Sequence, residues 1–219
     1  MSKPYTRRQI LQWLAGSTLL LGGRAIAGAF FLPKPGLKSI KGQVLINGKP
    51  AVVGQPVSWG DEVVTGSNSE AVFTVDGDAY LLRANTEVTL GLAAAEHVVK
   101  VQSGKMLAVF GPGEKTIRTQ AVTLGIRGTG LYVESHGARS YVCLCYGSVE
   151  LTPTADPAAR MTYQTKHHEH PYWVEGKQIK AASEVINHTD AELTMLEALQ
   201  YRRPPFANGL NSSGGGGGY

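Results

Sequence analysis

Short apolar runs separated by turn residues occupy the chain from Ser39 to Leu151. In the run 71–75 the apolar residues Ala71, Phe73 and Val75 alternate with others at the two-residue period of a strand with one buried face. Asn47-Gly48 is a strong signal for a two-residue hairpin turn. No helical period interrupts these runs, so the pattern predicts an all-β fold, a twisted solenoid-like or sandwich-like stack of short strands.

Two-residue turns that end in glycine mark the places where the predicted strands reverse. Thr65-Gly66 and Asp76-Gly77 are expected to supply the positive φ that a β-branched residue cannot adopt. The last predicted strand is 148–152, which gives a β domain over residues 40–152.

The pattern changes at Pro153, where the chain becomes more polar. Residues 153–206 are predicted to be a carboxy-terminal extension with a histidine-rich segment and one short α-helix. Thr189 and Glu192 have the spacing of a capping box, and the apolar residues of the helix are Leu193, Met195, Leu196 and Leu199. The glycine-rich residues 207–219 are predicted to be a flexible, disordered tail.

The first 27 residues have the pattern of an export signal. A basic start with Arg7 and Arg8 precedes an apolar centre that is shorter than a membrane span, and small residues follow up to Ala27. The arginine pair before Ile10-Leu11 resembles the twin-arginine signal. We therefore expect export by that route to the periplasm or the cell exterior, cleavage near Ala27 and no stable membrane span afterwards; an uncleaved anchor is the alternative.

Removing the signal changes the charge balance. The chain has 21 basic and 17 acidic residues, and four of the basic residues lie in the signal, which leaves 17 of each sign. A formally neutral domain without a clustered basic face gives no reason to expect a nucleic-acid partner.

Several motifs in a fixed order resemble the FecR domain. They are the Gly60-Asp61 before Val63-Val64 and Thr65-Gly66, the Asp76-Gly77 turn, the Asn85-Thr86 before a strand, and the Arg127-Gly128-Thr129 before an aromatic strand. The resemblance covers about half of the chain, residues 40–152, and implies an exported β module.

The resemblance implies the parts of a FecR-type regulator, which are a cytoplasmic anti-sigma segment, a membrane helix and an extracytoplasmic β region. Here only Met1 to about Arg8 precedes the apolar run, which leaves no room for the first of these parts. The expected function is therefore a binding or scaffolding module for a protein or an envelope polymer. An envelope signalling sensor is an alternative.

Catalytic motifs are missing from the sequence. It contains no nucleophile elbow, zinc-protease helix, phosphate loop or dinucleotide fingerprint. We therefore predict a protein without enzymatic activity.

The two cysteines raise three alternatives. Cys143 and Cys145 are expected on one strand face with Tyr141, while Val142, Leu144 and Tyr146 occupy the other face, so that the strand is buried on both sides. The favoured interpretation is a pair of small core residues. A strained disulfide is the third choice, because residues two apart on a strand have parallel side chains.

A metal site is the second choice. Thiolates and imidazoles together suit zinc or copper as the bound metal. The histidine-rich segment that follows the strand supplies the further candidate ligands His167, His168 and His170.

Arg127-Gly128-Thr129-Gly130 is expected to form a turn with close backbone approach. Arg127 would then contact an anion or carboxylate, or tie neighbouring turns together through bidentate hydrogen bonds; the second reading is favoured.

Overall fold

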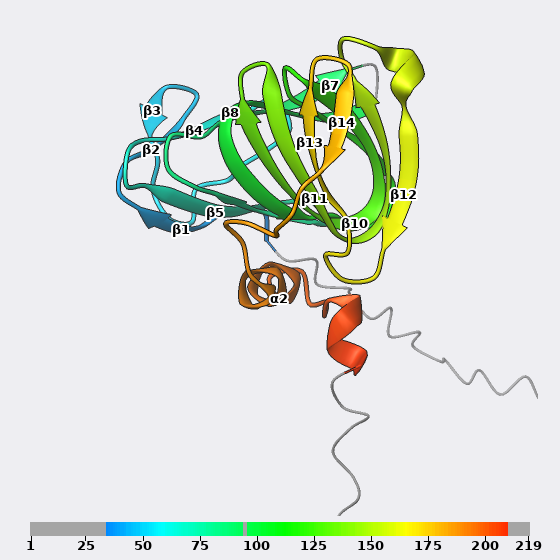
Figure 1. Ribbon diagram of the computed structural model, residues 1–219. Helices are drawn as coiled ribbons and strands as arrows, with labels where there is room; N and C mark the ends of the chain where they lie inside the picture. Colours follow the sequence, from blue (N-terminus) through cyan, green and yellow to red (C-terminus); the bar gives the residue numbers. More distant parts are fainter. Residues whose placement is uncertain (1–33, 94–95, 210–219) are drawn as a thin grey trace, which may run out of the picture. The chain divides into compact units, whose positions relative to one another are not determined.

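Strands make up most of the computed structural model, which describes residues 34–93 and 96–209 (Figure 1). Fourteen strands of this part form one open sheet, and the only α-helix in it is short. The strands are β1 (Gly36–Lys41), β2 (Val44–Ile46), β3 (Lys49–Pro50), β4 (Glu62–Thr65), β5 (Glu70–Val75), β6 (Asp78–Leu82), β7 (Glu87–Ala93), β8 (Glu96–Val109), β9 (Glu114–Arg118), β10 (Val122–His136), β11 (Arg139–Pro153), β12 (Met161–Thr165), β13 (Pro171–Glu175) and β14 (Gln178–Ala181). The helices are η1 (Pro157–Ala159), α2 (Asp190–Ala198) and η2 (Pro205–Gly209). The predicted all-β class is confirmed.

Three long strands organise the sheet. β8, β10 and β11 contain 14, 15 and 15 residues, and each pairs with different partners along its length. The main path runs β14-β13-β11-β10-β9-β8-β7-β4-β2-β3, with β1, β5, β6 and β12 attached beside it. All pairs are antiparallel except β8 with β9. The sheet curves strongly, and α2 packs against one of its faces at β6 and β8 (Figure 1).

Two apolar clusters lie on the opposite faces of this curved sheet. The larger one fills the concave side and includes Phe73, Tyr80, Val142 and Leu144. The smaller one lies between the sheet and the carboxy-terminal segment. It contains Val72, Ala79, Leu81, Leu107, Val109, Tyr132, Tyr141, Cys143, Cys145, Tyr146, Leu193 and Leu196. The strands shared by both clusters are therefore buried on both faces.

The hairpin turns agree with the sequence at two places and differ at a third. Asn47 and Gly48 have φ values of 52° and 73°, and Asp76 has a φ of 49°. At the Thr65-Gly66 corner the left-handed residue is Asn68, with a φ of 54°, whereas Gly66 has no positive φ. That expectation was wrong because Asn68, two residues after Gly66, makes the reversal; its short side chain tolerates this conformation.

The extension after Pro153 contains strands that the sequence pattern did not reveal. β12 and β13 both pair with β11, and β14 continues the sheet beyond β13. The α-helix starts with the predicted capping box, in which Thr189 and Glu192 bond each other's backbone. Residues 207–209, predicted as part of the tail, lie in η2, and residues 210–219 lie outside the described residues.

The apolar face of α2 is narrower than the sequence predicts. Leu193 and Leu196 are fully buried, but the Met195 side chain is on the open side of the helix, 36% exposed. The buried position next to Leu196 belongs instead to Glu197, whose carboxylate accepts hydrogen bonds from Tyr146 and Arg202. A carboxylate can be buried here because two donors satisfy it.

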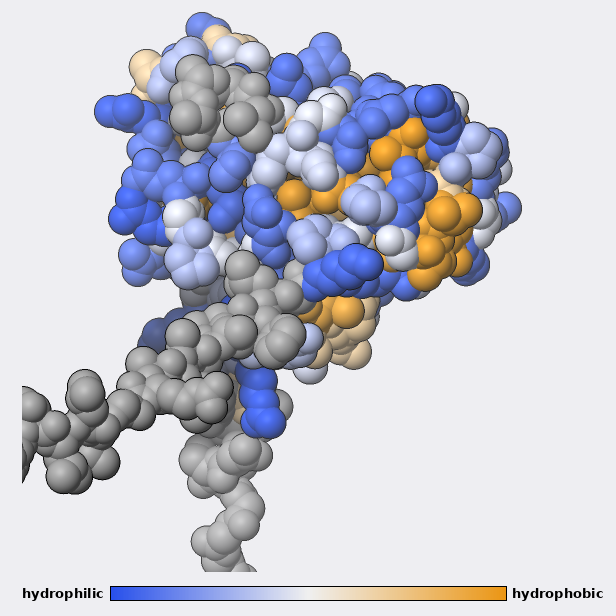
Figure 2. Space-filling model, turned by 180° about the vertical axis from the view of Figure 1, so that it is seen from behind, coloured by the Kyte–Doolittle hydropathy of each residue, from blue (hydrophilic) through white to orange (hydrophobic). Residues whose placement is uncertain are grey.

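The predicted export signal, residues 1–27, lies outside the described residues. In the part of the chain that is described, no helix has the length and apolar character needed to cross a membrane. On the side seen in Figure 2, hydrophilic residues cover most of the surface and a group of hydrophobic ones gathers at one side.

Candidate functional site

A β-bulge in β11 brings the candidate residues onto one face. Pairing with β10 passes from Leu144 opposite Leu131 to Tyr146 opposite Gly130, so that Cys145 is an extra residue in the strand. Tyr146 therefore joins Cys143 and Cys145 in the smaller cluster, and its predicted place on the opposite face was wrong. Strict alternation fails at a bulge because two consecutive residues oppose one.

Both cysteines are free and have no exposed surface. This burial agrees with the predicted position of Cys143 and Cys145 on a strand that is covered on both faces. Their sulfur atoms nevertheless face imidazole nitrogens: Cys143 Sγ lies 3.5 Å from Nδ1 of His168, and Cys145 Sγ lies 3.5 Å from Nε2 of His188.

The two histidines also meet each other. Nε2 of His188 lies 3.2 Å from Nδ1 of His168, and the four possible ligand atoms of Cys143, Cys145, His168 and His188 all lie within 4.8 Å of one another. We call these four residues the Cys/His cluster. Such a cluster is compatible with a metal site.

Three segments supply the Cys/His cluster. The cysteines come from β11, His168 from the loop between β12 and β13, and His188 from the segment just before the N-cap of α2. The backbone N–H of His168 donates to the carbonyl of Cys145 at 3.0 Å, which holds the loop against the strand. His168 has a φ of 52°, an unusual conformation that the hydrogen bond and the surrounding contacts maintain.

The outer nitrogens of both rings have hydrogen-bonding partners. Nε2 of His168 lies 3.0 Å from a carboxylate oxygen of Asp190, and Nδ1 of His188 lies 2.7 Å from the carbonyl oxygen of Ile186. The His188 ring also stacks on Tyr132, with 4.4 Å between ring centroids. These contacts fix the orientation of both rings.

The electrostatics of the cluster favour a thiolate. The pKa of Cys143 is lowered, chiefly by a hydrogen bond from Cys145 and further by both histidines, against the opposing effect of burial. Burial raises the pKa of Cys145, and the charge on Cys143 adds to this. For His168, burial alone would lower the pKa, but Cys143 and Asp190 raise it. Within the pair, the thiolate form is therefore favoured at Cys143 and disfavoured at Cys145.

Two of the predicted ligands lie outside this cluster. His167 is exposed and contacts Asp190, with Nε2 2.9 Å from each carboxylate oxygen. His167, His168 and Asp190 form a second group of possible ligands among the described residues. His170 is exposed and belongs neither to this group nor to the Cys/His cluster. Of the histidine-rich segment, only His168 reaches the cysteines.

The sequence analysis did not include His188 among the candidate ligands. It also missed Asp190, the first residue of α2. The available signal was their position around the Thr189 cap, since a capping box fixes the entry of the chain into the helix and therefore the side chains around it.

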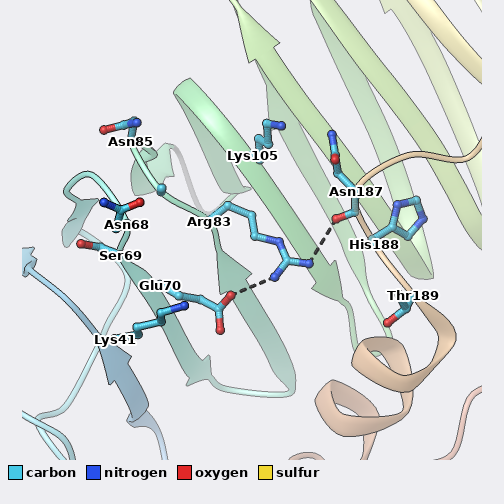
Figure 3. A pocket seen from close by; sticks show the side chains of 11 residues that line it. Lys41, Asn68, Ser69, Glu70, Arg83, Asn85, Lys105, Asn187, His188 and Thr189 are labelled. Atoms are coloured by element: carbon cyan, nitrogen blue, oxygen red, sulfur yellow. Dashed lines mark hydrogen bonds and ion pairs between the residues drawn. The ribbon is translucent and has the colours of Figure 1, made fainter.

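A polar cavity of about 670 Å³ adjoins the cluster at His188 (Figure 3). It is lined by Lys41, Asn68, Ser69, Glu70, Arg83, Ala84, Asn85, Lys105, Asn187, His188 and Thr189. Arg83 is fixed in it by three contacts, to Glu70 at 2.8 Å, to Glu192 at 2.5 Å and to the carbonyl oxygen of Asn187 at 3.1 Å. Lys41 and Lys105 lie on either side of Arg83 (Figure 3).

The predicted Arg127–Gly130 turn is a bulge inside β10. Arg127 pairs across the sheet with Glu114 of β9, and both side chains are largely exposed. The expected turn was wrong because Gly128, with a φ of 59°, absorbs the irregularity without reversing the strand. Gly130 provides the close approach, since a Cβ there would lie 2.5 Å from the Tyr146 ring.

The described part of the chain is thus an all-β protein built on one open sheet, with a buried Cys/His cluster beneath its carboxy-terminal segment. Residues 61–150 match the family model described as FecR protein. This region belongs to the FecR family. No curated protein matches the chain.

Two solved structures resemble the chain, and both are described as a candidate anti-sigma factor from Parabacteroides distasonis ATCC 8503. One has a TM-score of 0.49 at 16% sequence identity, covering 61% of this chain and 64% of its own. The other has a TM-score of 0.48 at 13% identity, covering 61% of this chain and 63% of its own. The chain therefore spans less than two thirds of either structure.

Proposed function

We propose that this protein is an exported FecR-type module of the cell envelope that binds a protein or envelope polymer and has no enzymatic activity. The FecR region supports a sensing or signalling module of the envelope. The export-signal pattern of residues 1–27 supports the periplasm or the cell exterior as its location.

The polar cavity is the observation that carries the proposal. It is built from Lys41 and residues of the FecR region between Asn68 and Lys105 on one side and from Asn187 to Thr189 on the other. Its charged lining consists of Lys41, Glu70, Arg83 and Lys105, and Arg83 and Lys105 form ion pairs with neighbouring carboxylates. A polar partner segment fits such a lining better than an apolar one.

Site-specific photo-crosslinking in the producing cell tests this function. A photoreactive residue at Asn68 or Asn85, both exposed at the cavity, should crosslink to one discrete envelope partner. The same residue at Lys177, in the exposed turn between β13 and β14, is the matched control and should not. Equal crosslinking at all three positions, or none at any, would refute the proposed surface.

Cell fractionation separates the binding module from a membrane-retained sensor. The proposal expects a processed chain that begins near Gly28 and fractionates with the exported proteins. A chain that stays in the membrane with its first residues intact would favour the sensor instead.

A further inference from the structure

Three of the six distances between ligand atoms in the Cys/His cluster match the edges of a tetrahedral metal site, and all six are at most 4.8 Å. Zinc bonds to sulfur and nitrogen at ~2.3 and ~2.0 Å, so a regular tetrahedron has edges of about 3.5 Å between S and N and about 3.3 Å between two N atoms. The corresponding distances here are 3.5 Å for Cys143 to His168, 3.5 Å for Cys145 to His188 and 3.2 Å between the two histidines. We propose that Cys143, Cys145, His168 and His188 bind one Zn²⁺ in a closed structural site.

The tautomers that the outer contacts select are the ones that a metal needs. Asp190 accepts a hydrogen bond from the Nε2–H group of His168, which leaves the lone pair of Nδ1 directed at the cluster. The carbonyl of Ile186 accepts from Nδ1 of His188, which leaves Nε2 free in the same way. A carboxylate or carbonyl behind a coordinating imidazole is the usual outer contact of a zinc ligand.

The donor set and its burial favour zinc over copper. Two thiolates and two imidazoles in a tetrahedron suit Zn²⁺, whereas Cu(II) prefers a square-planar arrangement. Both cysteines and His188 are buried and His168 is largely so, and the four side chains would occupy all four positions of a tetrahedral ion. Four protein ligands without an open position define a structural site rather than a catalytic one.

The proposed ion would join segments that are distant in the sequence. It would fasten the β12–β13 loop and the start of α2 to β11, which belongs to the FecR region. His188 also lines the polar cavity, so the same ion would hold one wall of that cavity. This inference concerns metal content and does not depend on the proposed function.

Metal analysis of the full chain, made without a histidine tag and kept reduced, is the first test. We expect about one equivalent of zinc after exchange into metal-free buffer. Protein that holds less than about a tenth of an equivalent, even after incubation with excess zinc, would overturn the site.

Variants assign the ligands. His188→Gln should lower the affinity for zinc by more than 100-fold, while His170→Gln, the exposed control from the histidine-rich segment, should leave it unchanged. Asp190→Asn should lower the affinity by about 10–100-fold, as removal of an outer contact does. The opposite ranking of His188→Gln and His170→Gln would assign the metal to the exposed segment and refute the cluster.

Cobalt substitution removes the dependence on variants that could fail to fold. Co²⁺ in the wild-type chain should give the strong visible bands of tetrahedral coordination and the near-ultraviolet charge transfer of bound thiolates. A pale octahedral spectrum would refute the site. A thiol titration of the protein isolated from cells that shows a disulfide between Cys143 and Cys145 would also refute the site.

Discussion

Arg83 and Glu192 form an ion pair across 109 residues of the chain, with Nη2 of the arginine 2.5 Å from Oε1 of the glutamate. Oε2 of the same carboxylate accepts from the backbone N–H of Thr189 in the capping box. Glu192 thus closes the first turn of α2 and binds that turn to the FecR region. One side chain thus takes part both in the capping box that starts the helix and in the ion pair that docks the helix on the sheet.

Replacement of Arg83 by glutamine should lower the free energy of unfolding by about 1–2 kcal/mol, because Glu70 and Glu192 lose a partly buried partner. Arg127→Gln is the matched control, since Arg127 and Glu114 are both mostly exposed, and its effect should stay below about 0.5 kcal/mol. Urea unfolding measures both. Equal effects would show that the Arg83 contacts do not stabilise the docked helix.

Met195 and Leu196 are neighbours in α2 but should contribute very differently to the free energy of unfolding. Leu196→Ala leaves a cavity beneath the helix and should cost about 2–4 kcal/mol. Met195→Ala removes a side chain from the open side of the helix and should cost less than about 1 kcal/mol. Thermal and urea unfolding test this contrast, and a larger loss for Met195→Ala would contradict the orientation of α2.

Gly130→Ala should destabilise the protein by about 1–3 kcal/mol, because the new Cβ would lie 2.5 Å from the Tyr146 ring. Gly125→Ala, in the same strand, meets nothing closer than 3.8 Å and should be neutral or slightly stabilising. Comparison of their unfolding midpoints is the measurement. Similar midpoints would mean that β10 and β11 separate easily at the bulge.

Glu134 should make the protein sensitive to acid. Burial would raise the pKa of its carboxyl, but hydrogen bonds from Tyr132, Asn187 and His136, together with the charge of Lys105, lower it below 4.5. As the pH falls through 4.5, the unfolded chain takes up a proton before the folded one does, so the stability that Glu134 contributes is lost on the acid side.

Glu134→Gln should therefore be less stable than the wild type near neutral pH, and the difference should shrink below pH 4.5. Unfolding by urea over a series of pH values measures this. A difference that stays constant down to strongly acidic pH would rule out the carboxylate as its source.

Removal of zinc should loosen the carboxy-terminal segment. If the protein is kept with free zinc at about 1,000 times the dissociation constant, binding adds about 4 kcal/mol, which chelation would remove. Chelator should then lower the Tm by roughly 10 °C, given about 2–4 °C per kcal/mol in a domain of this size. A Cys143→Ser, Cys145→Ser double variant should melt at the same temperature with and without chelator, and a chelator effect on it would contradict the site.

Local chemistry predicted part of this fold well. The Asn47-Gly48 turn and the capping box at Thr189 depend on a few adjacent residues, and both form as expected. The burial of Cys143 and Cys145 follows from apolar residues on both faces of one strand. These features could be predicted because neighbouring residues alone determine them.

The pattern of apolar and polar residues did not predict contacts between segments that are distant in the sequence. Gly104, with a φ of 87°, does not end a strand but lies inside the continuous β8. His168 faces the cysteines while His167 and His170 do not, because its left-handed backbone turns it toward β11. His188 meets them only because α2 docks beneath the sheet. Spacing along the chain contains no information on any of these three outcomes.

The two ends of the open sheet limit how copies of this protein could stack on one another. At one end β3 is two residues long and includes Pro50, which has no N–H to donate. At the other end, β14 is four residues long and has an exposed lysine, Lys180. Short, proline-containing and lysine-bearing margins resist strand-to-strand growth into fibres at these two ends. Edge-to-edge contact between copies is therefore left to β1 and β12, which each pair with a single strand of the described part.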